Sequence, residues 1–121
     1  MKFLFVEDET ELLELYQILL EDMDINFELA SNGEEALKKL ENENYDFVFS
    51  DIRMPKMDGF ELLSNILQKQ LKIKRFVFIT AHVDISKEEV EEKGAQDILY
   101  KPLGHKHLKS YIQDIMQATT A

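Results

Sequence analysis

Residues 47–51 read FVFSD, a short apolar run that ends on an acid. Residues 3–8 (FLFVED), 76–80 (FVFIT) and 98–101 (ILYK) have the same form. Short runs rich in Phe, Val and Ile are typical of strands buried on both faces of a parallel sheet. The carboxyl ends of parallel strands meet along one edge of the sheet, which is where open α/β sheets bind ligands. The runs therefore predict a single site that contains three carboxylates, a hydroxyl and an ammonium group.

Helical periodicity alternates with these runs. Leucines at helical spacing predict a helix over residues 10–22, and residues 26–30 follow as a strand. N-cap signals at Asn32, Asp58 and Ser86 open helices that should end near residues 42, 70 and 93, and a last helix should span residues 104–117. Five βα units in sequence require a parallel sheet with helices on both faces.

The length and composition indicate one globular domain. A chain of 121 residues is long enough for one hydrophobic core, so residues 1–121 are expected to form a single domain. Residues 117–121 are expected to be a frayed tail or the start of a linker. The absence of cysteine excludes disulfides and thiolate metal sites.

Charge and hydropathy argue against nucleic-acid binding and against insertion into a membrane. A formal net charge of −10 argues against direct nucleic-acid binding by this domain. No apolar stretch approaches the roughly 20 residues that span a bilayer, so no membrane contact is expected. A strand-like run begins at once and leaves no room for a signal peptide. We therefore expect a cytoplasmic location.

The acids at the predicted sheet edge suggest a metal site. Glu7, Asp8 and Asp51 would repel one another and raise at least one pKa unless a cation intervenes. Mg²⁺ fits because it takes one or two carboxylates and keeps water or phosphate oxygens in its other positions. The alternative is that residues 7–9 form an ordinary solvated acidic turn.

Asp51 could also act as a nucleophile. A carboxylate beside Mg²⁺ can attack phosphorus and form an acyl phosphate. Lys101 would supply an ammonium group and Thr80 a hydroxyl donor for the phosphoryl oxygens. Each residue also has an ordinary interpretation, with Thr80 bonding its own backbone and Lys101 exposed or paired with an acid. Their joint placement at strand ends favours the functional one.

Several stretches together resemble the receiver domain of two-component response regulators. They are residues 6–9 (VEDE), 50–59 (SDIRMPKMDG), 79–81 (ITA), 94–97 (GAQD) and 100–102 (YKP). The resemblance implies a flavodoxin-like (βα)5 fold with a five-stranded parallel sheet in the order 2-1-3-4-5 and helices on both faces. It also implies a Lys101–Pro102 bond that is cis.

The resemblance also assigns roles to the site residues. Asp51 would accept a phosphoryl group from a sensor histidine kinase or a histidine phosphotransfer protein. Glu7, Asp8 and Asp51, with the backbone carbonyl of Arg53, would hold Mg²⁺, and Mn²⁺ could replace it. Thr80 and Lys101 would sense the acyl phosphate. A shift in the fourth and fifth units would then regulate a partner or an output domain.

Three features depart from the family pattern. The first acid is Glu7 rather than the more common Asp, a variation that the family tolerates. The usual aromatic switch position holds Ile98, and we expect Tyr100 on the opposite side of the strand from it. One subfamily dimerises through charged pairs, but His107 and Tyr111 replace the Glu and Arg of its last helix.

Two other functions are consistent with parts of this pattern. An aspartyl-nucleophile phosphohydrolase would use the same Asp51, but such enzymes carry a second acid where this chain has Arg53. A receiver-like module that binds partners without phosphorylation would lack the acceptor, an acid or the lysine, and all of them are present.

Overall fold

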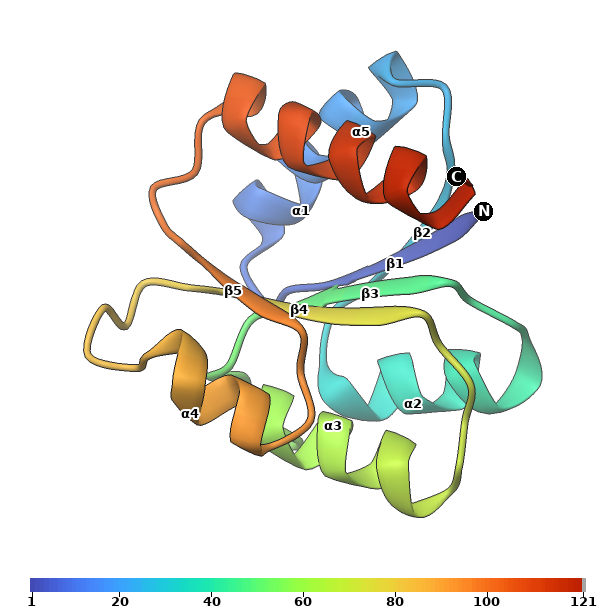
Figure 1. Ribbon diagram of the computed structural model, residues 1–121, viewed down its shortest axis with the longest axis vertical. Coiled ribbons are helices and arrows are strands. Elements are labelled where there is room, and N and C mark those ends of the chain that lie inside the picture. Colours follow the sequence, from blue (N-terminus) through green and yellow to red (C-terminus); the bar gives the residue numbers. More distant parts are fainter. Residues whose placement is uncertain (121) are drawn as a thin grey trace.

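Five parallel strands form a single sheet in the order β2-β1-β3-β4-β5 (Figure 1). The computed structural model describes residues 1–120. The strands are β1 (Lys2–Val6), β2 (Asn26–Ala30), β3 (Phe47–Ser50), β4 (Arg75–Thr80) and β5 (Asp97–Tyr100). The helices are α1 (Thr10–Asp22), α2 (Gly33–Asn42), α3 (Gly59–Gln68), α4 (Lys87–Glu92) and α5 (His105–Thr120). The flavodoxin-like (βα)5 fold and its strand order are confirmed.

Local signals set most of the helix boundaries. Asn32, Asp58 and Ser86 cap the helices that follow them, and the last two form complete capping boxes. Gln70 adopts a left-handed φ of 55°, and α3 ends just before it, slightly earlier than predicted. The last helix continues to Thr120, so residues 117–120 are helical where a frayed tail was expected. Ala121 lies outside the described residues.

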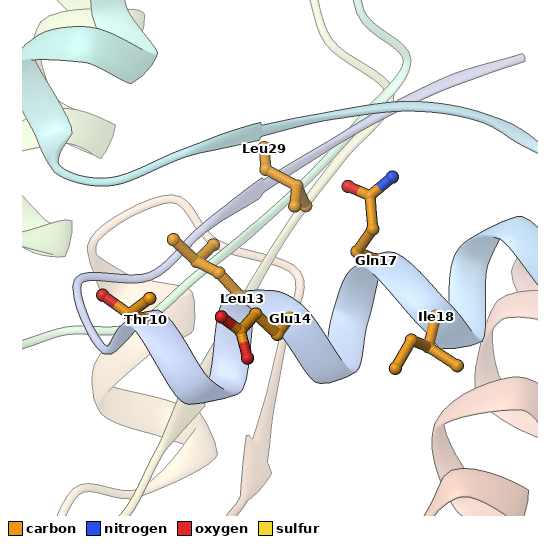
Figure 2. A pocket seen from close by; sticks show the side chains of 6 residues that line it. All are labelled: Thr10, Leu13, Glu14, Gln17, Ile18 and Leu29. Carbon is orange, nitrogen blue, oxygen red and sulfur yellow. The ribbon is translucent and has the colours of Figure 1, made fainter.

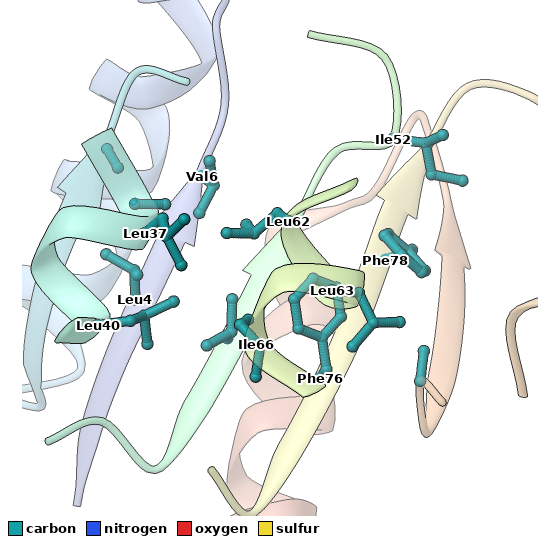
Figure 3. Packing of buried hydrophobic residues seen from close by; sticks show 14 of the residues in the cluster. Leu4, Val6, Leu37, Leu40, Ile52, Leu62, Leu63, Ile66, Phe76 and Phe78 are labelled. Carbon is teal, nitrogen blue, oxygen red and sulfur yellow. The ribbon is translucent and has the colours of Figure 1, made fainter. Parts of the chain in front are cut away.

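Side chains alternate between the two faces of the sheet and build two separate cores. On the face covered by α1 and α5, Phe5 stacks on Phe49 with ring centroids 4.6 Å apart. The opposite face packs against α2, α3 and α4, where Leu4 of β1 and Phe78 of β4 meet Leu62 and neighbouring residues (Figure 3). Both faces are therefore apolar, as parallel strands require.

Strand register brings the predicted site residues to one edge. Val6 pairs with Ser50, and Thr80 pairs with Tyr100. Glu7, Asp51 and Lys101 each follow one of these paired residues directly. Within residues 1–120, no helix has the length and apolar character needed to cross a membrane.

Candidate functional site

Three carboxylates converge beyond the carboxyl ends of β1 and β3. Glu7, Asp8 and Asp51 each offer an oxygen atom, and these atoms lie within 4.8 Å of one another. Glu7 and Asp51 are buried, whereas Asp8 is exposed. Carboxylate oxygens in this number and spacing are suitable ligands for a hard divalent cation. We call Glu7, Asp8, Asp51 and the neighbouring Lys101 the acidic pocket.

Lys101 joins the two buried acids of this pocket. Its Nζ atom donates to Glu7 Oε1 at 2.8 Å and to Asp51 Oδ2 at 2.9 Å. The lysine follows β5, and its backbone N–H donates to the carbonyl oxygen of Thr80 at 2.8 Å. The Lys101–Pro102 peptide bond is cis, as the resemblance predicts. Strands β1, β3 and β5 thus each contribute one member of a charged network.

Burial and the hydrogen bonds of Lys101 shift the pKa values of this network in opposite directions. Burial is the main cause that raises the pKa of Glu7 to about 7, and the negative charge of Asp51 adds to the effect. Lys101 works in the opposite direction and stabilises the Glu7 carboxylate. Burial alone would lower the pKa of Lys101, but its hydrogen bonds to Glu7 and Asp51 outweigh burial and raise it. Lys101 therefore remains an ammonium ion near neutral pH.

Backbone contacts hold Asp51 in place. Its Oδ1 atom accepts the N–H of Ile52 at 2.7 Å. Its other carboxylate oxygen, Oδ2, accepts the hydrogen bond from Lys101. Its carbonyl oxygen accepts the buried hydroxyl of Ser50 at 2.8 Å. A Cβ atom on Gly59 would lie 2.3 Å from that same carbonyl oxygen, so only glycine fits where α3 begins. The Gly59 N–H also donates to Ile52 at 2.7 Å.

Thr80 and Arg53 lie on neighbouring segments. Thr80 is fully buried at the end of β4, and its Oγ1 atom accepts the N–H of His82 at 3.2 Å. Accepting this bond leaves the hydroxyl proton for donation elsewhere. Arg53 lies two residues after Asp51 in the loop between β3 and α3, with an exposed side chain.

The expected position of Tyr100 is wrong. Tyr100 and Ile98 are two residues apart on β5, and a period of two places them on the same side. Ile98 is buried in the cluster that contains Val90 of α4. The Tyr100 hydroxyl donates to the carbonyl oxygen of Ile85, at 2.5 Å, in the segment that leads into α4. An aromatic residue of β5 therefore contacts the segment that leads into α4, from the position directly before Lys101.

Asp97, at the start of β5, contacts one residue of α5 and one residue of α4. The Tyr111 hydroxyl donates to Asp97 Oδ2 at 2.8 Å, and Lys87 Nζ lies 3.8 Å from Asp97 Oδ1. Burial, followed by this hydrogen bond, raises the pKa of Tyr111. Asp97 thus has a hydrogen-bond partner within the chain in Tyr111.

Sequence reasoning missed three contacts near this edge. It did not assign a partner to the Ser50 hydroxyl, did not predict that Lys101 bridges Glu7 and Asp51, and did not find the Tyr100 contact with Ile85. The alternation along β5 was a usable signal for Tyr100. The other contacts depend on side-chain geometry across strands that are distant in sequence.

An apolar pocket lies away from the acids. Its volume is about 410 Å³, and it opens between α1 and β2 (Figure 2). Its lining is mostly apolar and consists of Thr10, Leu13, Glu14, Gln17, Ile18 and Leu29. None of the predicted site residues contributes to it, and a polar anion finds no cationic group among these side chains. This pocket is therefore separate from the acidic pocket.

Comparisons with known proteins agree with this geometry. The chain is 38% identical over 120 residues to a CpxR homolog of Haemophilus influenzae, a transcriptional regulatory protein, covering 99% of this chain and 52% of the relative. It is 32% identical to the alkaline phosphatase synthesis regulator PhoP of Bacillus subtilis, covering 96% of this chain and 48% of that protein. The chain thus spans about half the length of these curated relatives.

Solved structures show the same fold. The response regulator TrrA of Thermotoga maritima, in complex with Mg²⁺–BeF, superimposes with a TM-score of 0.81 at 30% identity, covering 93% of this chain and 96% of that one. The chemotaxis protein CheY4 of Vibrio cholerae gives a TM-score of 0.82 at 31% identity with the same coverage. The family model for the response regulator receiver domain matches residues 3–113. This chain belongs to the response regulator receiver domain family.

Proposed function

We propose that the chain is a phosphorylation-dependent switch in which Asp51 accepts a phosphoryl group from a sensor histidine kinase or a histidine phosphotransfer protein. The observation that carries the proposal is the position of Lys101, which lies 2.9 Å from Asp51 Oδ2 and 2.8 Å from Glu7 Oε1 in a pocket of three carboxylates. A nucleophilic carboxylate, a cation-binding group and an ammonium ion are the parts that phosphoryl transfer to an acid requires.

The donor set of the acidic pocket fits Mg²⁺. Its carboxylate oxygens are hard ligands within 4.8 Å of one another, and Mg²⁺ binds such oxygens while it keeps several waters. Glu7, Asp8 and Asp51 would hold the ion together with the Arg53 backbone carbonyl, and Mn²⁺ would use the same ligands. When bound, the ion neutralises negative charge on the phosphoryl oxygens.

The proposed transfer uses the Asp51 carboxylate as the nucleophile. An oxygen–phosphorus bond forms on Asp51 while the nitrogen–phosphorus bond of the donor phosphohistidine breaks. The imidazole leaves with that electron pair and takes up a proton. Lys101 and the hydroxyl of Thr80 stabilise the charge on the transferred group.

The output of the switch would involve the last two βα units. A phosphoryl group on Asp51 draws Lys101 and Thr80 toward it, and both residues adjoin the segment that Tyr100 holds through Ile85. Phosphorylation would thereby shift the population of the protein between two conformations of α4 and β5. Because relatives about twice as long are transcriptional regulators, we propose that an output partner or domain reads this shift.

Slow loss of the phosphoryl group, rather than rapid turnover, is part of this proposal. Phosphohydrolases that use an aspartyl nucleophile carry an acid where this chain has the exposed Arg53. Arg53 and the half-buried His82 flank the expected phosphoryl position. Replacing both with Ala should change the phosphoryl lifetime, and an unchanged lifetime would exclude them as tuning residues.

The test is exposure of the protein to acetyl phosphate and Mg²⁺, followed by mass measurement. The wild type should gain one phosphoryl group, and Asp51→Asn should gain none. Omitting Mg²⁺ should suppress the adduct in the wild type. No adduct on the wild type, or an equal adduct on Asp51→Asn, would contradict the proposal.

A further inference from the structure

The junction between β2 and α2 contacts both chain segments that form the acidic pocket. The carbonyl oxygen of Ala30 accepts the backbone N–H of Glu7 at 3.0 Å. Three residues later, Gly33 packs against Met57 in the loop between β3 and α3. This is the loop that carries the Arg53 carbonyl. The junction therefore contacts both chain segments of the pocket, one through Ala30 and the other through Gly33.

Gly33 leaves no room for even one additional carbon atom. A Cβ atom at this position would lie 2.4 Å from the backbone oxygen of Met57 and 2.9 Å from its Cβ and Cγ atoms. Favourable contacts between non-bonded heavy atoms lie near 3.5–4.0 Å. Because the nearest atom belongs to the backbone, a flexible side chain could not relieve the overlap. The loop itself would have to move.

A movement of Met57 would shift the rest of the loop back toward Arg53. Pro55 has a fixed φ and Lys56 adopts a left-handed φ of 70°, so neither residue adjusts freely. The N–H of Met57 donates to the carbonyl oxygen of Pro55 at 2.9 Å and tightens the turn. Met54 is buried in the core between this turn and Arg53. A displacement at Met57 therefore strains the short segment that begins at Arg53.

We infer that Gly33 is a positioning residue for the acidic pocket. Because Gly33 has no side chain, Met57 packs directly against it. This contact sets the separation between the segment that begins at Glu7 and the loop that contains Arg53. Gly33 itself contributes no ligand. The inference rests on the proposed role of the pocket as a Mg²⁺ site.

The experiment measures Mg²⁺ binding by calorimetric titration of the wild type and Gly33→Ala. Gly33→Ala should bind Mg²⁺ about tenfold more weakly, the effect typical of residues that orient metal ligands. Without metal, its backbone NMR shifts should change over residues 53–58. Gly104→Ala is the glycine control, because a Cβ atom there meets nothing within 4 Å. Leu40→Ala is the stability control, because it removes a buried side chain at the far end of the same helix.

The outcomes separate this inference from the proposed function. No Mg²⁺ binding by the wild type overturns both. Binding by the wild type with equal affinity in Gly33→Ala overturns only the positioning role, as does an equal loss in Leu40→Ala. Where Gly33→Ala does not fold, Met57→Gly releases the same contact from the loop side, and an unchanged Mg²⁺ affinity in that variant overturns the inference.

Discussion

The acidic pocket and the side of β5 that faces α4 adjoin each other, but different forces hold them. The pocket depends on a buried ion-pair network, in which Lys101 pairs with Glu7 and Asp51. The α4-facing side of β5 depends on packing of Ile98 and on one hydrogen bond from Tyr100, which is 37% exposed. The pocket holds the acids and the lysine that the resemblance assigns to it, with Glu7 where Asp is more common, whereas the β5 side has Ile98 at the expected aromatic position. We therefore expect that substitutions on the α4-facing side of β5 leave the chemistry of the pocket intact.

The largest effect on stability should come from removing Ile98. Ile98→Ala leaves a cavity between β5 and α4 and should lower the free energy of unfolding by about 3 kcal/mol. Urea denaturation measures this loss. Phosphorylation by acetyl phosphate should still occur, because Ile98 belongs to the apolar cluster under α4 and contributes no polar group to the pocket.

Val83→Ala is the control, since Val83 is 75% exposed and its truncation should change little. If Ile98→Ala also abolishes the adduct on Asp51, the two regions are not separable.

Removing Lys101 should have a smaller effect on stability but a direct effect on the pocket. Lys101→Met takes charged hydrogen bonds from two buried acids and should cost about 2 kcal/mol at pH 8. At pH 5 the cost should be smaller, because Glu7 then carries a proton and no longer needs a cation. Urea denaturation at both pH values checks this, with the exposed Lys106→Met as the matched lysine control. Equal losses in the two variants would contradict the network.

The affinity for Mg²⁺ should depend on pH through Glu7. A pKa of about 7 means that Glu7 is protonated below neutrality, and a protonated carboxyl must lose its proton before it binds a metal. Affinity should therefore fall about tenfold between pH 8 and pH 6. Calorimetric titration at several pH values measures this change.

The raised pKa of Glu7 also predicts how the stability of the metal-free protein depends on pH. The pKa of Glu7 is 4.5 when unperturbed and about 7 in the fold, so the folded state binds the proton more tightly. The stability that this proton contributes is present below pH 4.5 and is lost as the pH rises through 7. Glu7→Gln should remove the pH dependence of the Mg²⁺ affinity and the pH dependence of the stability. If either dependence persists in that variant, another group causes it.

The smallest expected effect concerns the Tyr100 hydroxyl. Tyr100→Phe removes a partly exposed hydrogen bond and should cost less than about 1 kcal/mol. Amide hydrogen exchange should nevertheless become faster over residues 81–86, because this segment loses its tie to β5. Tyr111→Phe, which removes a hydroxyl on the other flank, should leave that segment unchanged. Identical exchange in the wild type and Tyr100→Phe would show that the bond does not hold the segment.

Sequence reasoning succeeded where local chemistry determines the structure. The apolar runs predicted the strands, and the cap residues Asn32, Asp58 and Ser86 predicted where helices begin, because each cap satisfies backbone groups of its own helix. The residues at the strand ends predicted the acidic pocket, because parallel strands align their carboxyl ends. These inferences need only the identity and spacing of neighbouring residues.

Sequence reasoning failed where distant segments meet. The bridge from Lys101 to Glu7 joins residues that are 94 positions apart, and the overlap that excludes a side chain at Gly33 depends on where Met57 lies. Such contacts follow from packing, which a local pattern does not encode. Tyr100 differs, because its side of β5 was predictable from alternation along the strand.

The bridging position of Lys101 has a consequence for which ions the pocket accepts. Three carboxylates and one ammonium ion leave two uncompensated negative charges in a confined space. One divalent cation restores neutrality, whereas one monovalent cation does not. Protonation of Glu7 would reduce the deficit to a single charge, so acidification would remove both a ligand and the electrostatic preference for a doubly charged ion. The number of unpaired charges would thus favour a divalent over a monovalent ion in this pocket.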